Sequence, residues 1–140
     1  MLRGLSTFNL WAADLPAAVR WYADLLGVEP YFTSEAVGRG PGYVEFRIGD
    51  YQHELGIIDR RFAPPGLAAE RGGTIAYWHV DDLPAALDRL LARGAELLEP
   101  LTERGPGFVT PSVVDPFGNV LGVMYNRHYL AVLGRRDAPQ

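Results

Sequence analysis

The sequence predicts an α+β fold made of two tandem βαβββ units, and three observations support this. The segment Asp14-Leu15-Pro16-Ala17-Ala18 returns 68 residues later as Asp82-Leu83-Pro84-Ala85-Ala86. Each copy follows an apolar stretch and precedes a helical pattern that ends at a glycine, Gly27 or Gly94. A second pair of similar segments, residues 54–58 and 120–124, keeps nearly the same offset, 66 residues. Two copies of one supersecondary unit account for all these matches, whereas a chance likeness between two alanine-rich helices accounts only for the first.

Both helices have clear start signals, and strands follow each of them. Asp14 and Asp82 are expected to be N-caps, with a proline in the first turn. The first unit (5–59) has expected strands at residues 5–12, 28–35, 43–48 and 52–59, the last two joined by a tight Gly49-Asp50 turn. The second unit (73–126) has them at 74–80, 95–102, 108–114 and 119–125, with a type I turn at 115–118. A linker, 60–72, joins the units, and the tail, 127–140, is expected to hold a short helical turn and then fray.

Composition narrows the function classes. The chain has 140 residues, 48% of them hydrophobic, which suits one soluble globular domain. Its net charge of −4 argues against a nucleic-acid partner, and the absence of cysteine excludes disulfides and thiolate metal sites. The sequence contains no apolar run long enough for a membrane span, so no membrane partner and a cytoplasmic location are expected.

The duplicated unit, the D-L-P-A-A helix starts and the D-P-F-G-N turn at 115–119 together resemble the vicinal oxygen chelate superfamily. That superfamily contains glyoxalase I, the bleomycin resistance proteins and the extradiol dioxygenases, and the resemblance covers about residues 5–126. It implies that each unit forms a curved mixed sheet and that two such units enclose a cavity. It also implies a homodimer, for which the apolar, proline-rich segment 62–67 offers a crossing between subunits.

Enzymes of that superfamily hold a divalent metal with His, Gln or Glu at four strand positions. The resemblance carries these positions to Thr7, Gly56, Gly122 and Ile75, or to Thr74 with a slip of one residue. None of these residues is an imidazole or a carboxylate, which are the ligands such a site needs. We therefore expect no metal and no cofactor, and the resemblance favours the metal-free branch of bleomycin-resistance-like binding proteins.

Strand alternation then assigns side chains to the predicted cavity. The cavity set mixes flat aromatic rings with polar groups, as ligand pockets commonly do. Its members are Thr7, Asn9, Trp11, Tyr43, Glu45, Arg47, Gln52, Glu54, Gly56, Ile75, Tyr77, His79, Ser112, Val114, Val120, Gly122 and Met124. For Trp11, Tyr77 and Met124, simple packing is an equally good interpretation.

The leading functional hypothesis is a protein that binds an aromatic or natural-product-like small molecule. An alternative is a metal-independent lyase, isomerase or cyclase that uses Glu54 and His79 as acid–base groups. Against that role, Glu54 can pair with Arg47, and His79 can simply cap the sheet edge. Two further alternatives are a metal-dependent glyoxalase or dioxygenase activity with atypical ligands, and a module that acts mainly as a dimeric partner.

Overall fold

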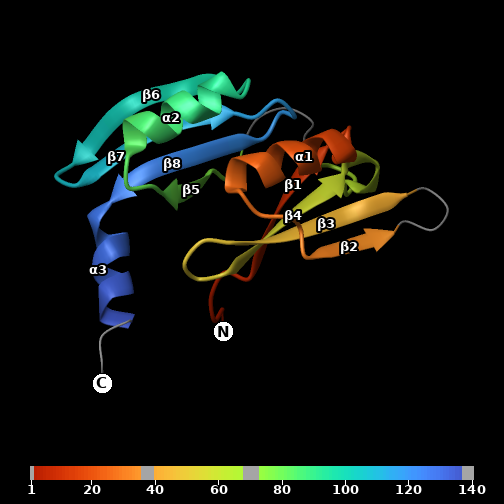
Figure 1. The fold of residues 1–140 in the computed structure, drawn as a ribbon, viewed down its shortest axis with the longest axis horizontal. Helices are drawn as coiled ribbons and strands as arrows, with labels where there is room; N and C mark the ends of the chain where they lie inside the picture. Colours follow the sequence, from red (N-terminus) through yellow and green to blue (C-terminus); the bar gives the residue numbers. More distant parts are fainter. Residues whose placement is uncertain (1, 36–39, 68–72, 137–140) are drawn as a thin grey trace. The chain divides into compact units, whose positions relative to one another are not determined.

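The first unit of the chain is a four-stranded mixed sheet covered on one face by a helix. The computed structural model describes residues 2–35, 40–67 and 73–136. The elements of this unit are β1 (Thr7–Ala12), α1 (Leu15–Leu26), β2 (Phe32–Glu35), β3 (Pro41–Ile48), β4 (His53–Asp59) and a 3-10 turn, η1 (Arg60–Phe62). The strand order is β1-β4-β3-β2, with β1 parallel to β4 and the other pairs antiparallel. Figure 1 shows α1 lying along this sheet.

The second unit repeats this topology. Its elements are β5 (Ala76–His79), α2 (Leu83–Ala92), β6 (Glu96–Gly105), β7 (Phe108–Val114), β8 (Val120–Asn126) and α3 (Arg127–Arg136). The strand order is β5-β8-β7-β6, and β5 runs parallel to β8 as β1 does to β4 (Figure 1). The two units are separately compact. The expected α+β fold of two tandem βαβββ modules is thus confirmed.

The helix starts form as the sequence predicts. The Asp14 carboxylate accepts the backbone N–H of Ala17 at 3.1 Å, and Asp82 accepts that of Ala85 at the same distance. These bonds satisfy amide groups that have no partner within the helix. No helix within the described residues is long and apolar enough to span a membrane.

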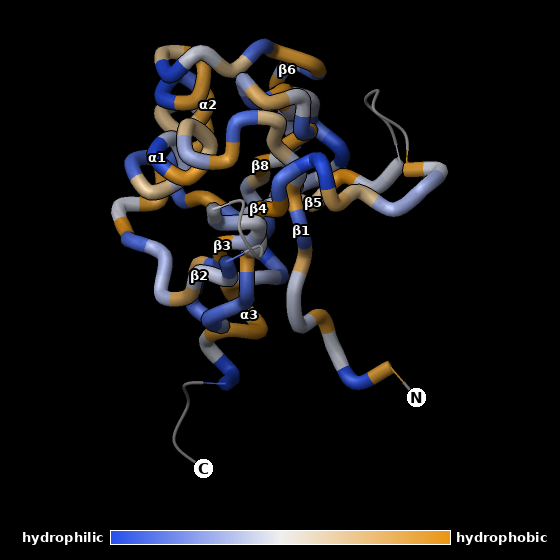
Figure 2. The backbone as a smooth tube through the Cα atoms, turned by 90° about the vertical axis from the view of Figure 1, so that its right-hand side faces the viewer, coloured by the Kyte–Doolittle hydropathy of each residue, from blue (hydrophilic) through white to orange (hydrophobic). Residues whose placement is uncertain are grey.

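Each sheet buries its apolar face against its own helix. In the first unit, Leu15, Ala18 and Tyr22 of α1 are buried together with alternate residues of β3 and β4. Those strand residues are Val44, Phe46, Ile48, Leu55 and Ile57. In the second unit, α2 buries Leu83, Leu87 and Leu90. Apolar and polar segments alternate along both helices (Figure 2), as expected where one helix face packs and the other is solvated. Glu45, Arg47 and Glu54 alternate with the buried residues of β3 and β4 and therefore lie on the sheet face opposite α1.

Two sequence expectations about local structure were wrong. Ile48 pairs with His53, so β3 and β4 are joined by the four residues 49–52 and not by a two-residue turn. The Gln52 N–H donates to the Gly49 carbonyl at 3.1 Å, and Gln52 has a φ of +53°, which takes it out of the strand. The tail forms a ten-residue helix, α3, because the Asn126 side chain accepts the N–H groups of His128 and Tyr129 and caps its start.

Two strand boundaries differ from the expected ones by three residues or more. β2 begins at Phe32 and not at residue 28, and β6 continues to Gly105, three residues beyond its expected end. The extension of β6 follows from its pairing with β7, which continues down to the Gly105–Phe108 pair. Cross-strand pairing, which a local pattern does not reveal, sets both limits.

Candidate functional site

Three rows of side chains cross the face of the first sheet opposite α1. The strand register aligns Thr7, Glu54 and Arg47 in one row, because Thr7 and Arg47 both pair with Glu54. The next row is Asn9, Gly56 and Glu45, and the third is Trp11, Ile58 and Tyr43. The predicted cavity residues of this unit thus share one face, except Gln52, which lies in the turn.

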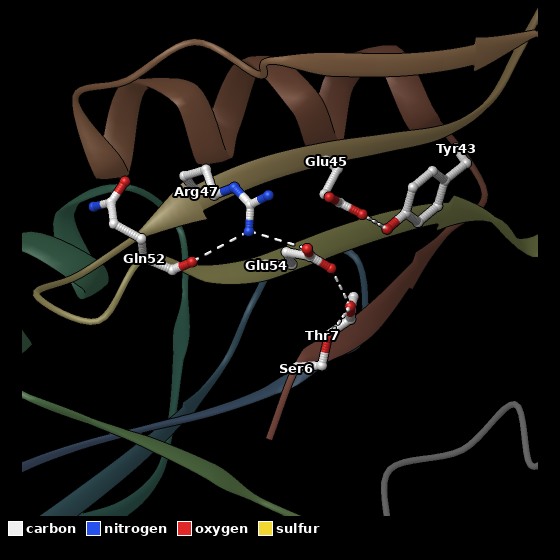
Figure 3. A network of polar contacts seen from close by, with 7 residues as sticks. All are labelled: Ser6, Thr7, Tyr43, Glu45, Arg47, Gln52 and Glu54. Carbon is white, nitrogen blue, oxygen red and sulfur yellow. Dashed lines mark hydrogen bonds and ion pairs between the residues drawn. The ribbon is translucent and has the colours of Figure 1, made fainter. Parts of the chain in front are cut away.

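Glu54 is the centre of the polar network on this face (Figure 3). The Arg47 guanidinium donates to its carboxylate at 3.0 Å, and the Thr7 hydroxyl donates to the other carboxylate oxygen. The Thr7 hydrogen bond, followed by the charge and hydrogen bond of Arg47, lowers the pKa of Glu54. The guanidinium also stands 4.8 Å from the centre of the Tyr31 ring. The Glu54–Arg47 pairing weighed in the sequence analysis is therefore present.

A second carboxylate, Glu45, lies beside this network, and its pKa shifts in the opposite direction to that of Glu54. The Tyr43 hydroxyl donates to Glu45 (Figure 3). Partial burial and then the negative charge of Glu54 raise the pKa of Glu45, while Arg47 offsets part of this. Burial and the charge of Glu54 also raise the pKa of the Tyr43 phenol. This corner of the sheet disfavours further negative charge and suits a neutral or cationic group.

Gly56 leaves room that its neighbours fill. A Cβ atom placed on Gly56 would lie 2.6 Å from Cε2 of Tyr43 and 2.8 Å from its hydroxyl oxygen, and closer still to the Asn9 amide oxygen. These distances are shorter than real carbon contacts allow, so the Tyr43 ring and the Asn9 amide lie directly over the glycine backbone. Next to Tyr43 is an open pocket of about 400 Å³, lined by Ser34, Glu35, Gly42, Tyr43, Ile58 and Phe62.

The sequence patterns do not predict this pocket. They assign no role to Ser34 or Glu35, and they place Phe62 in the linker. A signal was available, because Ser34 pairs with Tyr43, a residue already assigned to the cavity face. Phe62 carries no such pattern, since it comes from the 3-10 turn that follows β4.

The second sheet has a matching glycine under a tyrosine. Tyr77, Gly122 and Ser112 form one row across β5, β8 and β7, because Tyr77 and Ser112 both pair with Gly122. A Cβ atom on Gly122 would lie 2.6 Å from Cε1 and 2.7 Å from Cγ of the Tyr77 ring. The ring therefore fills the space above Gly122, while 39% of Tyr77 is exposed. Ser112 is fully buried beside it.

His79 is held by partners on several sides. Its Nδ1 accepts the backbone N–H of Asn126 at 3.1 Å, and its Nε2 lies 3.2 Å from the Asp81 carboxylate. The ring stacks on Tyr129 of α3 with centroids 4.9 Å apart and planes at 12°. Only 6% of the side chain is exposed. On the same face, Met124 pairs with His79 and accepts a long contact from the Asn126 amide.

Glu54 and His79 therefore have separate sets of partners in separate units. Their joint action as an acid–base pair remains a prediction. The same applies to the ligand-binding roles predicted for Thr7, Asn9 and Trp11.

The residues at the four positions matched to metal ligands do not fit a divalent ion. Gly56 and Gly122 supply no donor, and Tyr43 and Tyr77 occupy the space that a glutamate side chain would need. The Thr7 hydroxyl donates a hydrogen bond to Glu54, and Ile75 is apolar. Among the residues that the structure describes, no three His, Asp or Glu side chains gather closely enough to hold a metal.

Known structures and a family model agree with this fold. A glyoxalase-related enzyme from Fulvimarina pelagi is 21% identical, with a TM-score of 0.69 and 89% of each chain covered. Protein ATC0852 from Agrobacterium tumefaciens is 22% identical, with a TM-score of 0.71, 89% of this chain and 98% of that chain covered. A glyoxalase/bleomycin resistance protein from Catenulispora acidiphila is 24% identical, with a TM-score of 0.58, 86% of this chain and 97% of that chain covered.

At these identities the structures show a shared fold. No curated protein matches the sequence significantly. The model of the Glyoxalase/Bleomycin resistance protein/Dioxygenase superfamily matches residues 4–123, nearly the whole repeat. The chain belongs to this superfamily.

Proposed function

We propose that this protein binds an aromatic, natural-product-like small molecule on the sheet faces opposite α1 and α2, without a metal ion. One observation carries the proposal. Each unit has a buried glycine with a tyrosine ring lying over its backbone, Gly56 under Tyr43 and Gly122 under Tyr77. A backbone surface without a Cβ accepts a flat ring in contact with the peptide plane. An aromatic guest can stack on these tyrosines or take their places.

The polar groups of the first unit add orientation to such binding. Arg47, Glu45 and Tyr43 lie on the same face as Gly56 and present hydrogen-bonding groups of different charge. Charge-assisted hydrogen bonds from such groups orient a guest more strongly than neutral ones. The open pocket next to Tyr43 gives room for a substituent of the guest.

Binding is favoured over metal-independent catalysis by the state of the two predicted acid–base groups. Glu54 has a lowered pKa and two hydrogen-bond donors, which makes it a weaker base than a free carboxylate. His79 uses both ring nitrogens in contacts within its own unit. A proton-transfer role would require each group to leave its present partners.

We also propose that two copies of the chain form a homodimer. Phe62 and Leu67, which flank the proline-rich part of the linker, are 45% and 46% exposed. Exposed large apolar side chains favour a protein–protein interface, and these two lie in the segment expected to cross between the subunits. Light scattering at high protein concentration tests this, and a strictly monomeric mass contradicts it.

Native mass spectrometry of the freshly purified protein, before and after a chelator, tests the binding function. A retained organic mass that the chelator does not remove supports it. A stoichiometric divalent metal contradicts it.

The matched variants are Gly122→Leu, which fills the space above the sheet, and Gly134→Leu, whose Cβ meets open space in α3. The organic mass should be lost from the first variant and kept by the second.

A further inference from the structure

Ser112 has a buried hydroxyl without a hydrogen-bond partner. Its Oγ contacts no donor or acceptor among the described residues, and the side chain is fully buried. Buried polar groups in native proteins nearly always have partners, so a free one points to a group that is not part of the chain. A second hydroxyl on the same strand is satisfied, because Thr110 Oγ1 accepts the Arg104 Nε–H at 3.0 Å.

Ser112 lies at one end of the row that contains Gly122 and Tyr77. Neighbouring strands are about 4.8 Å apart, so the two outer residues of the row lie about 10 Å apart, which leaves room for one aromatic ring with a polar group at its edge. The middle of the row is bare backbone at Gly122, and the Tyr77 ring lies above it.

The Tyr77 ring lies partly at the surface. The side chain is 39% exposed, and its hydroxyl makes no hydrogen bond to any described residue. A rotation about its first side-chain torsion therefore costs no polar contact. Such a rotation uncovers the Gly122 backbone, which is paired with Ser112 on the neighbouring strand.

We propose that this row is a slot for an uncharged aromatic ring with a hydrogen-bond acceptor at its edge, such as an aryl ketone. The ring of the guest lies on the Gly122 backbone, and Tyr77 moves aside to pack against it. The Ser112 hydroxyl donates a hydrogen bond to the acceptor atom of the guest. The assignment rests on the proposed binding function and specifies which guest chemistry the second unit recognises. A neutral acceptor suits the slot because none of its three residues carries a charge.

The test compares two probes of the same shape, acetophenone and α-methylstyrene. They differ in one group, since a methylene replaces the ketone oxygen. Their dissociation constants are measured by amide-shift titration of the ¹⁵N-labelled protein. The shifts are expected in residues 76–79 and 120–124. The wild type should bind acetophenone about fivefold more tightly than α-methylstyrene, the usual effect of one neutral hydrogen bond.

Ser112→Ala should abolish this preference and leave the affinity for α-methylstyrene unchanged. Thr33→Ala, which removes an exposed hydroxyl from the first unit, should keep this preference. The proposal is overturned if the wild type shows no preference, if the preference survives in Ser112→Ala, or if the shifts fall outside the second unit. An organic mass retained by the purified protein would still support the proposed function in each of these cases.

The midpoint of urea unfolding, measured on the ligand-free protein, tests the assignment independently of the binding measurements. Ser112→Ala removes a hydroxyl that has no partner, so the midpoint should stay the same or rise. A lowered midpoint would show that the hydroxyl supports the fold and would overturn the assignment.

Discussion

The contact between Tyr77 and Gly122 predicts a mutation whose effect changes sign with its background. In the wild type, the Cβ of Gly122→Ala would meet three ring carbons of Tyr77, two of them at 2.6 and 2.7 Å. Carbon atoms in favourable contact are about 3.5–4.0 Å apart, so the ring must retreat by about 1 Å or leave the sheet. A ring that leaves re-exposes roughly 40 Å² of apolar surface, which costs about 1 kcal/mol at about 25 cal/mol per Å².

The backbone contributes in the opposite direction. Gly122 does not have a positive φ, so alanine fits its backbone and restricts the unfolded chain. That restriction stabilises by about 0.4–1 kcal/mol. Overpacking usually costs about 1–3 kcal/mol, and the exposed ring places this site in the lower part of that range, at about 1.5 kcal/mol. We expect Gly122→Ala to destabilise the wild type by roughly 0.5–1 kcal/mol.

In a Tyr77→Ala background the clash is absent and only the backbone effect remains. There, Gly122→Ala should stabilise the protein by about 0.4–1 kcal/mol. Urea unfolding of all four proteins, followed by circular dichroism, measures both effects and their coupling. If Gly122→Ala destabilises both backgrounds equally, the Tyr77 ring does not lie over Gly122, and the argument for a ring-sized space there fails.

Two further predictions concern Glu45 and Asp115. A raised pKa in the folded state means that Glu45 contributes stability below its ordinary pKa of 4.5, and that this contribution is lost as pH rises through the raised value. Glu45→Gln should therefore raise the midpoint of thermal unfolding at about pH 7 and leave it unchanged at about pH 4. An equal rise at both pH values would contradict this prediction. Asp115, 3% exposed, accepts three hydrogen bonds from Phe117 and Asn119. Asp115→Ala should cost about 2–4 kcal/mol in urea unfolding, while Asp88→Ala on the exposed side of α2 should change stability by less than about 0.5 kcal/mol.

The parts of the fold that follow from local chemistry could be predicted from the sequence. Asp14 and Asp82 cap their helices within three residues, so the sequence carries the whole signal. Strand alternation likewise separates Val44 and Phe46, which are buried, from Glu45 on the opposite face. Duplication then links the two halves, because a pattern found twice at one spacing is unlikely to arise by chance.

The parts of the fold that depend on contacts between residues far apart in the sequence could not be predicted. The hydrogen bond from Thr7 to Glu54 joins residues 47 positions apart and appears only when β1 pairs with β4. The turn at 49–52 depends on Gln52 taking a positive φ, which its residue type does not suggest. The helical signal of the tail was also incomplete. Its N-cap, Asn126, is the last residue of a strand and serves both elements.

His79 shows how such a distant contact can be tested. The backbone N–H of Asn126 donates to Nδ1 of His79 at the point where β8 becomes α3, and Tyr129 of α3 stacks on the ring. No residue of α3 is fully buried, so these contacts are a large part of what holds the helix. His79→Phe keeps an aromatic ring but removes the acceptor, and His79→Asn keeps an acceptor near Nδ1 but removes the stack. Each loss should cost about 1 kcal/mol, which corresponds to roughly fivefold faster amide hydrogen exchange in residues 127–136. Exchange in α1, measured in the same samples, should not change. If both variants exchange at the wild-type rate in α3, His79 does not anchor the helix, and an acid–base role for its imidazole becomes the better explanation of its position beside Met124.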